Sequence, residues 1–208
     1  MKIIDMNIKE YMDVLKTDAP APGGGSVSGI TAAQGIALTL MVLELTIGKE
    51  KYKEYEEQNI EIRKECLKLY DELLNAADAD KEAFTKLSEG YKLPKNTEEE
   101  KSKRKEIIGN LSIDATKAPF DVIIKSLEAV KLTDKIVGKS NKMASSDLGV
   151  AAACLNTAAK SAWLNVKINL PYLTDEDLKV KFEREGKETL AEIEKISNEI
   201  YDKVQGAL

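Results

Sequence analysis

Residues 26–43 of this chain read SVSGITAAQGIALTLMVL, eighteen consecutive positions without a charged side chain. Wound as a helix, the stretch is apolar on most of its faces, which is typical of a helix buried at the centre of a protein. It follows APAPGGGS (residues 19–26), where two prolines hold the backbone extended and three glycines permit close approaches. Ser26 is the expected N-cap, and Gly48 is the expected stop. The pattern predicts a central buried helix that starts from a glycine-rich loop.

The rest of the chain is helical in pattern and has no runs of alternating β-branched residues, so almost no sheet is expected. Pro119 is expected to kink or split the helix in which it lies. We predict an all-α fold in which residues 1–208 form a single domain, an antiparallel helical bundle with long helices. Helices are expected at residues 7–17, 26–46, 52–89, 97–137, 145–169 and 174–204, with capping by Ser145 or Ser146 and by Thr174 at the last two.

Composition excludes several classes of protein. The net charge of −5 over 208 residues lacks the electrostatic footprint of a nucleic-acid binder. Cys66 and Cys154 match no metal or disulfide spacing and fit a reducing cytosol, so a cytoplasmic location is expected. The stretch 26–43 is long enough to span a bilayer, but its Ser, Thr, Gln and Gly favour a buried helix and no membrane partner.

The chain contains no histidine. The usual general base near neutral pH and the commonest transition-metal ligand are therefore missing. We expect no metal site. Any catalysis must use carboxylates, Lys, Tyr, Cys, amides or bound water.

The glycine-rich loop has two interpretations. Gly23, Gly24 and Gly25 lead into Ser26 at a helix start, where free backbone N–H groups form a binding site for an anion or a carbonyl. A tight loop between helices, with no ligand, explains the same residues equally well. Neither a P-loop nor a dinucleotide fingerprint is present, because no Gly-Lys-Ser/Thr closes the loop and no strand precedes it.

Asp80 stands out on the third expected helix. Its position continues a seam of apolar residues, where Leu or Ile would be usual, and a buried carboxylate is costly unless it is paired. Burial would raise its pKa and suit it to proton transfer. The alternative is that the seam turns toward solvent near the end of the helix, which would leave Asp80 exposed. Asp78 falls on another face and is expected to be solvated.

A second group of polar residues shares one face of the helix at 145–169. Asp147, Asn165 and Asn169 lie on this face. Asp147 follows a helix start, where the dipole alone would explain it. Asp147 and Asn165 would be about 27 Å apart on a straight helix, so they serve opposite ends of a long ligand or meet through a symmetry mate. Lys49 lies at a helix end, where the helix dipole alone would explain a positive charge. Lys167 lies beside Trp163, where snorkelling would explain it. An anionic ligand is the alternative explanation for these lysines.

Together these segments resemble the C-terminal domain of the formiminotransferase-cyclodeaminase family. The resemblance covers nearly the whole chain and depends on six blocks in order: PAPGGGSVSG from Pro20, LELTIGKEKY ending at Tyr52, DKEAF at 80–84, LPK at 93–95, ASSDLGVAA from Ala144 and LNVKINL from Leu164. The stretch 107–122 fits poorly apart from Pro119. The resemblance implies an all-helical domain that acts on folate as a two-fold homodimer, and the length is similar to that of free-standing methenyltetrahydrofolate cyclohydrolases.

The resemblance implies hydrolysis of 5,10-methenyltetrahydrofolate to 10-formyltetrahydrofolate, with no cofactor beyond the tetrahydrofolate substrate. A carboxylate can attract the cationic substrate and activate water. By position the glycine block would contact folate, and Asp147 or Asp80 would be the carboxylate at the reacting carbon. Asn165 and Asn169 would orient the pterin or the one-carbon unit, and Lys49 or Lys167 would meet the glutamate carboxylates.

Two other functions are compatible with these residues. A formiminotetrahydrofolate cyclodeaminase would use the same site to close a ring and expel ammonia. A helical dimer without activity, binding folate or a partner protein, would need only the capping and packing roles that each motif can also fill.

Overall fold

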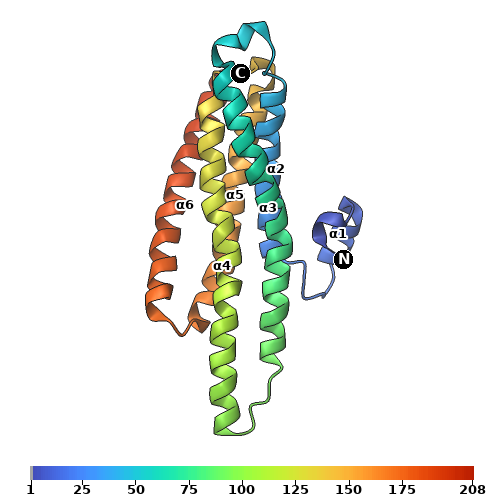
Figure 1. The fold of residues 1–208 in the computed structure, drawn as a ribbon, viewed down its shortest axis with the longest axis vertical. Helices are drawn as coiled ribbons and strands as arrows, with labels where there is room; N and C mark the ends of the chain where they lie inside the picture. The colour runs from blue at the N-terminus through green and yellow to red at the C-terminus, as the bar shows by residue number, and fades with distance from the viewer. Residues whose placement is uncertain (1) are drawn as a thin grey trace.

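The computed structural model describes residues 2–208, and within that range every element is helical. Of the six α-helices, the five long ones, α2 to α6, form an elongated bundle, and the short helix α1 lies to one side of it (Figure 1). Their bounds are α1 Ile8–Leu15, α2 Gly24–Glu44, α3 Glu56–Tyr91, α4 Glu98–Ile136, α5 Ser145–Asn169 and α6 Glu176–Gln205. Short 3-10 helices lie at η1 Ile3–Asp5, η2 Glu50–Tyr55, η3 Lys142–Ala144 and η4 Leu170–Tyr172. The all-α prediction is confirmed.

Helix α2 lies at the centre and packs on α3 and α5, as its uncharged sequence predicts. A Cβ at Gly35 would lie 2.8 Å from the Leu155 side chain and 3.0 Å from the carbonyl oxygen of Ala151, so small residues allow this close approach. Among residues 2–208, α2 is the one helix long and apolar enough to cross a membrane, and 56% of that window is buried inside the protein. Its apolarity is largely accounted for by packing.

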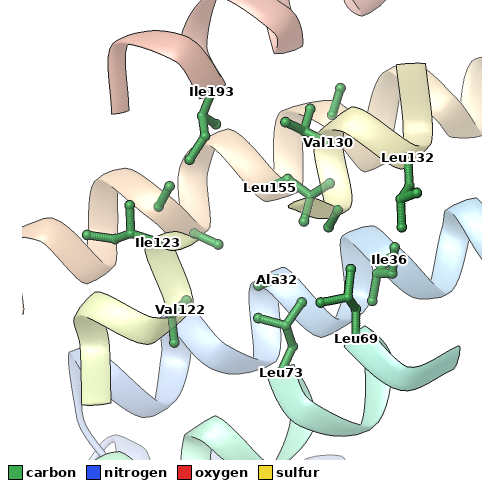
Figure 2. Packing of buried hydrophobic residues seen from close by; sticks show 14 of the residues in the cluster. Ala32, Ile36, Leu69, Leu73, Val122, Ile123, Val130, Leu132, Leu155 and Ile193 are labelled. Carbon is green, nitrogen blue, oxygen red and sulfur yellow. The ribbon is translucent and has the colours of Figure 1, made fainter. Parts of the chain in front are cut away.

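The main core cluster draws on α2, α3, α4, α5 and α6, and two smaller clusters lie around Leu87 and around Tyr11. Figure 2 shows Ile36 of α2, Leu73 of α3, Ile123 of α4, Leu155 of α5 and Ile193 of α6 converging in it. These five side chains are fully buried. Because each of these five helices buries its apolar side chains against the others, the bundle folds as a unit around this cluster.

Three details of the helix ends differ from prediction. Helix α2 begins before Ser26, at Gly24, with Gly23 as N-cap and no side-chain cap. Helix α5 follows directly from η3, so Ala144 rather than a serine occupies its N-cap. Asp175, not Thr174, caps α6 by accepting from the Leu178 N–H. Caps depend on local backbone geometry, which sequence spacing fixes only to within a residue or two.

Helix α4 is not split at Pro119, contrary to one of the two outcomes considered above. Proline has no N–H, so the carbonyl of Ala115, four residues earlier, loses its helical partner. The Asn169 side chain from α5 donates to this carbonyl at 2.8 Å and also to its own helix at Asn165 O, 3.0 Å away. Asn169 therefore satisfies the acceptor that Pro119 leaves free and joins α5 to α4.

Candidate active site

The glycine-rich loop places the first turn of α2 in direct contact with α3. A Cβ built on Gly25 would lie 1.9 Å from Oδ1 and 2.1 Å from Cγ of Asp80, so only glycine leaves room for the Asp80 carboxylate. The Ser26 hydroxyl donates to the Ala77 carbonyl oxygen at 3.0 Å and fastens the same turn of α2 to α3. Two segments 55 positions apart in sequence thus meet at a carboxylate and the first turn of a helix.

Asp80 is partly buried, and its pKa is raised to about 6 from an ordinary value of 3.8. Loss of solvation is the main cause, and hydrogen bonding from Ser26, chiefly from its backbone N–H, opposes it. Unpaired N–H groups at a helix start favour a negative charge. The group is therefore anionic at neutral pH and close enough to neutrality to exchange a proton.

Asn165 lies beside the same loop. A Cβ on Gly24 would be 3.2 Å from Asn165 Oδ1, and the Nδ2 group donates to the Ser161 carbonyl oxygen at 2.9 Å. One amide N–H of Asn165 is engaged in its own helix, so the side chain keeps its oxygen as an acceptor and its second N–H as a donor. The structure therefore brings together Gly24, Gly25, Ser26, Asp80 and Asn165, with Gly23 as the N-cap of α2.

Asp147 and Lys49 lie at the other end of the bundle. Helix α5 is unbroken from Ser145 to Asn169, so Asp147 and Asn165 are separated by about 27 Å along its axis. Since Gly24 contacts Asn165 and Gly35 contacts Leu155, the glycine loop adjoins the far end of α5 from Asp147. Lys49 follows the C-terminal end of α2 and is exposed. Within one chain, neither residue reaches Asp80.

Lys167 is directed to α6 instead of to the glycine loop. Its Nζ lies 3.0 Å from Glu183 Oε1 and 5.9 Å from the centre of the Trp163 ring. Trp163 in turn packs on Gly186, where a Cβ would come within 2.3 Å of the ring. These contacts account for Lys167 by packing and ion pairing between α5 and α6, and Asn169 is engaged as described above.

The prediction that Asp78 is solvated is wrong. Its side chain is 8% exposed and accepts a hydrogen bond from the Ile3 N–H at 2.6 Å. The carboxylate thereby anchors the N-terminal segment to α3. Sequence spacing on α3 could not reveal this contact, because the partner lies 75 positions away.

Tyr11 of α1 is a neighbour of the site that the sequence reasoning missed. It is 8% exposed and clusters with Ile3 and Ala77, and its hydroxyl oxygen is buried without a hydrogen-bond partner among residues 2–208. Burial and, second, the charge of Asp80 raise its pKa. The i,i+4 spacing of Tyr11 and Leu15 on a short helix is the sequence signal that would have indicated a packed face here.

Among residues 2–208, no group of three or more His, Cys, Asp or Glu side chains could hold a metal ion. Cys66 is buried and Cys154 is partly buried, and both are free thiols. Burial raises the pKa of both thiols, that of Cys66 to about 12, so neither is a ready nucleophile. The chemistry available at the glycine loop is that of one carboxylate, an amide and the start of a helix.

Comparison with known proteins identifies the family. The formiminotransferase-cyclodeaminase family pattern matches residues 7–188. A methenyltetrahydrofolate cyclohydrolase of Methylorubrum extorquens is 35% identical over 95% of both chains. A formimidoyltransferase-cyclodeaminase of Gallus gallus is 33% identical over 77% of this chain, which spans only 30% of that longer protein.

The fold is also that of a solved relative. The crystal structure of a formiminotetrahydrofolate cyclodeaminase from Thermotoga maritima superposes with a TM-score of 0.81 at 28% identity, over 100% of this chain and 98% of the other. The sequence match extends over both the glycine loop and the helix that carries Asp80. This chain belongs to the formiminotransferase-cyclodeaminase family.

Proposed function

We propose that the protein is a methenyltetrahydrofolate cyclohydrolase, which hydrolyses 5,10-methenyltetrahydrofolate to 10-formyltetrahydrofolate. The observation that carries the proposal is Asp80, a partly buried carboxylate with a pKa of about 6, held against the first turn of α2 at Gly25. The similarity to the Methylorubrum enzyme over nearly the full length of both chains supports the substrate. The enzyme acts on a C–N bond of a cyclic amidine and serves one-carbon metabolism.

The reaction needs a base and an electrostatic partner for a cation. The carbon between N5 and N10 carries amidinium charge, and the Asp80 carboxylate stabilises this charge in the bound substrate. Asp80 accepts a proton as water forms a bond to this carbon. The bond from the carbon to N5 then breaks, and N5 takes the proton of the new hydroxyl as the formyl group forms on N10. One proton is released for each water consumed, so no cofactor beyond the folate is required.

The other predicted residues have assigned places in this proposal. Gly23, Gly24, Gly25 and Ser26 form the wall against which the pterin approaches, and Asn165 presents its amide oxygen to a pterin N–H. Asn169 supports Asn165 through its hydrogen bond to the Asn165 backbone. We place the enzyme in the cytoplasm, where two free thiols remain reduced.

We further propose that the antiparallel bundle works as a two-fold dimer formed along α5. An uncharged stripe of exposed or partly exposed side chains runs the length of this helix: Val150, Ala153, Cys154, Thr157, Ser161, Leu164 and Ile168. A groove of about 530 Å³ lies along the first part of the stripe, from Val150 to Thr157, between it and Tyr201 of α6. A continuous apolar surface of this kind is typical of a protein interface, and a second copy of the chain would cover it.

Two-fold symmetry would also complete the site. The stripe is centred near Thr157, so an axis there would place each end of α5 beside the opposite end of the partner helix. Asp147 of the second copy would then approach Asn165 and Asp80 of the first. Lys49 of the second copy, at the same end of the bundle as Asp147, would come toward this site as well. A site shared in this way accounts for two polar clusters that one chain keeps about 27 Å apart.

Turnover of methenyltetrahydrofolate tests the proposed function. We expect the purified protein to accelerate loss of methenyltetrahydrofolate absorbance well above buffer hydrolysis, with 10-formyltetrahydrofolate as product. The Thermotoga relative makes formiminotetrahydrofolate the second substrate to examine, with ammonia release as the measurement. Ammonia release without methenyltetrahydrofolate hydrolysis would favour a cyclodeaminase, and turnover of neither substrate would overturn the enzymatic proposal.

Mixing two inactive variants tests the shared site. In a mixed dimer of Asp80→Asn and Asp147→Asn chains, one of the two sites would contain both native aspartates. After denaturation and refolding of an equal mixture, half of the dimers are mixed, so we expect activity to recover to about a quarter of the native level. Separately refolded variants are the control. Absence of recovery, or a monomer in sedimentation, would contradict the shared site.

A further inference from the structure

Helix α3 carries exposed aromatic side chains past the point where α2 begins. Phe84 and Tyr91 are each 40% exposed, and Tyr172 of η4 is 48% exposed. At 3.6 residues per turn, Asp80, Phe84 and Tyr91 fall within about 40° of one another around α3. Because α2 starts beside Asp80, it does not cover this face farther along α3. Figure 1 shows α3 and α4 continuing as a hairpin beyond the start of α2. The exposed aromatic side chains of α3 lie on this part of the helix, between the carboxylate and the end of the hairpin.

Tyr91, Tyr172 and Arg104 lie together at the far end of this aromatic surface. The rings of Tyr91 and Tyr172 meet edge to face, with their centres 6.1 Å apart. Arg104 of α4 lies 6.0 Å from the centre of the Tyr91 ring, and its Nη2 donates to the Tyr91 carbonyl oxygen at 3.2 Å. The arrangement combines flat apolar surface with a fixed positive charge.

Arg104 lacks the partner that the other arginines have. Arg63 and Arg184 pair with Glu44 and Glu185, whereas no carboxylate among residues 2–208 lies within 4.0 Å of Arg104. Its Nε is buried and has no hydrogen-bond acceptor in the described part of the chain. An unsatisfied guanidinium N–H gains most from a carboxylate, which can take two of its hydrogen bonds at once.

Space for a ligand adjoins this guanidinium. Arg104 lines a groove of about 520 Å³ at the loop that joins α3 to α4, together with Lys103 and the carboxylates of Glu99 and Glu100. Glu100 already accepts hydrogen bonds from the backbone N–H groups of Asn96 and Thr97, so it is held at the helix cap. A carboxylate that entered the groove would meet Lys103 and Arg104, with Glu99 as the opposing charge. Loop residues at the end of a long hairpin can adjust to a ligand at low cost.

We propose that Phe84, Tyr91, Tyr172 and Arg104 form the subsite for the aminobenzoyl-glutamate half of the substrate, with Arg104 binding a glutamate carboxylate. The inference rests on the proposed function. Tyr91 is eleven positions beyond Asp80 on α3, about 16 Å along the axis. An aromatic ring and an amide link separate the one-carbon bridge of folate from its glutamate, so an aromatic surface between base and cation matches the order of groups. Arg104 takes the role that Lys49 or Lys167 was expected to fill.

A substrate without glutamate separates this subsite from the reacting centre. We expect Arg104→Gln to raise KM for 5,10-methenyltetrahydrofolate roughly 10-fold or more, with kcat nearly unchanged. For 5,10-methenyltetrahydropteroate, which lacks the glutamate, the variant and native KM should agree. Tyr172→Leu should raise KM for both compounds, because both contain the aminobenzoyl ring. Lys105→Gln, an exposed change on the next residue, is the matched control.

The outcomes distinguish the two proposals. Equal KM increases for both compounds in Arg104→Gln, or none in either, would overturn the subsite while leaving the cyclohydrolase intact. Absence of native turnover with both compounds would overturn the proposed function itself. Circular dichroism and the thermal midpoint of each variant show whether the helices persist. Should Arg104→Gln fail to fold, Arg104→Lys supplies the same comparison with the charge kept and the paired geometry lost.

Discussion

Asp80→Asn is expected to lower kcat for methenyltetrahydrofolate by about 100-fold or more, because the proposed base is replaced by an amide that cannot accept the proton. The same change should stabilise the fold at pH 8. The rise in the pKa of Asp80 from 3.8 to about 6 means that its buried negative charge costs about 3 kcal/mol of stability, which Asn does not carry. The amide makes weaker hydrogen bonds with Ser26, which reduces this gain by about 1 kcal/mol. A gain of about 2 kcal/mol in the free energy of unfolding, with activity lost, would distinguish a functional carboxylate from a structural one.

The pH dependence follows from the same pKa. The native state keeps the Asp80 proton up to about pH 6, whereas the unfolded chain loses it near 3.8. The stability contributed by this group is therefore full below pH 4 and is lost as the pH rises through 6, so the advantage of the Asn variant should appear over that interval. Native kcat/KM should rise through about pH 6, where the free base forms.

Asp78→Asn is the matched control, two residues away on the same helix. It weakens the hydrogen bond from the Ile3 N–H, so it should lower the free energy of unfolding by about 1 kcal/mol and leave most of kcat. Denaturant unfolding and steady-state kinetics measure both quantities. If Asp80→Asn destabilised the protein, or kept native kcat, the assignment of Asp80 as the base would be wrong.

Gly25→Ala is expected to have a comparable effect on activity through sterics alone. The added Cβ would lie 1.9 Å from Asp80 Oδ1, so the carboxylate or the start of α2 must move. We expect kcat to fall by about 100-fold, because misplacement of a catalytic group by about 1 Å is costly. The free energy of unfolding should fall by about 1–3 kcal/mol.

The neighbouring glycines, Gly23 and Gly24, leave more room for a Cβ than Gly25 does and serve as graded controls. A Cβ on Gly23 would meet nothing within 4 Å, and one on Gly24 would come 3.2 Å from the flexible Asn165 side chain. Steric strain should therefore be absent in Gly23→Ala, where only the poorer N-cap preference of Ala acts, and slight in Gly24→Ala. In denaturant unfolding, both changes should reduce stability less than Gly25→Ala does. Equal destabilisation by all three changes would show that general loop flexibility, and not the Asp80 contact, explains the glycines.

Much of the fold was predictable because it depends on nearby residues. The capping box of Thr97 and Glu100 forms as its spacing predicts. Gly48 adopts a φ of +78°, which L residues rarely take, just beyond the end of α2. The uncharged stretch 26–43 forms the central helix, where its buried apolar side chains join the main core cluster.

The candidate site was predictable only in part. Periodicity marked Asp80 as unusual on its helix, but it also assigned Asp78 to solvent, and Asp78 is buried by an N-terminal segment that periodicity cannot place. Asn169 was selected as a ligand residue, yet its N–H group satisfies the carbonyl left free by Pro119 on another helix. Arg104 belongs to no motif, and the spacing of Tyr11 and Leu15 indicates only a packed face, because an unsatisfied Arg104 Nε or Tyr11 hydroxyl is visible only in the tertiary structure.

The sequence by itself determined the helices, their approximate ends and the uncharged helix at the centre, since capping, helix propensity and apolar periodicity act within a few residues of each position. Only the tertiary structure decided that Gly25 meets Asp80, that Asn165 joins them and that Asp147 does not. The reason is physical: periodicity shows which side chains share a face of one helix, whereas packing between helices far apart in sequence decides which face is covered and by what.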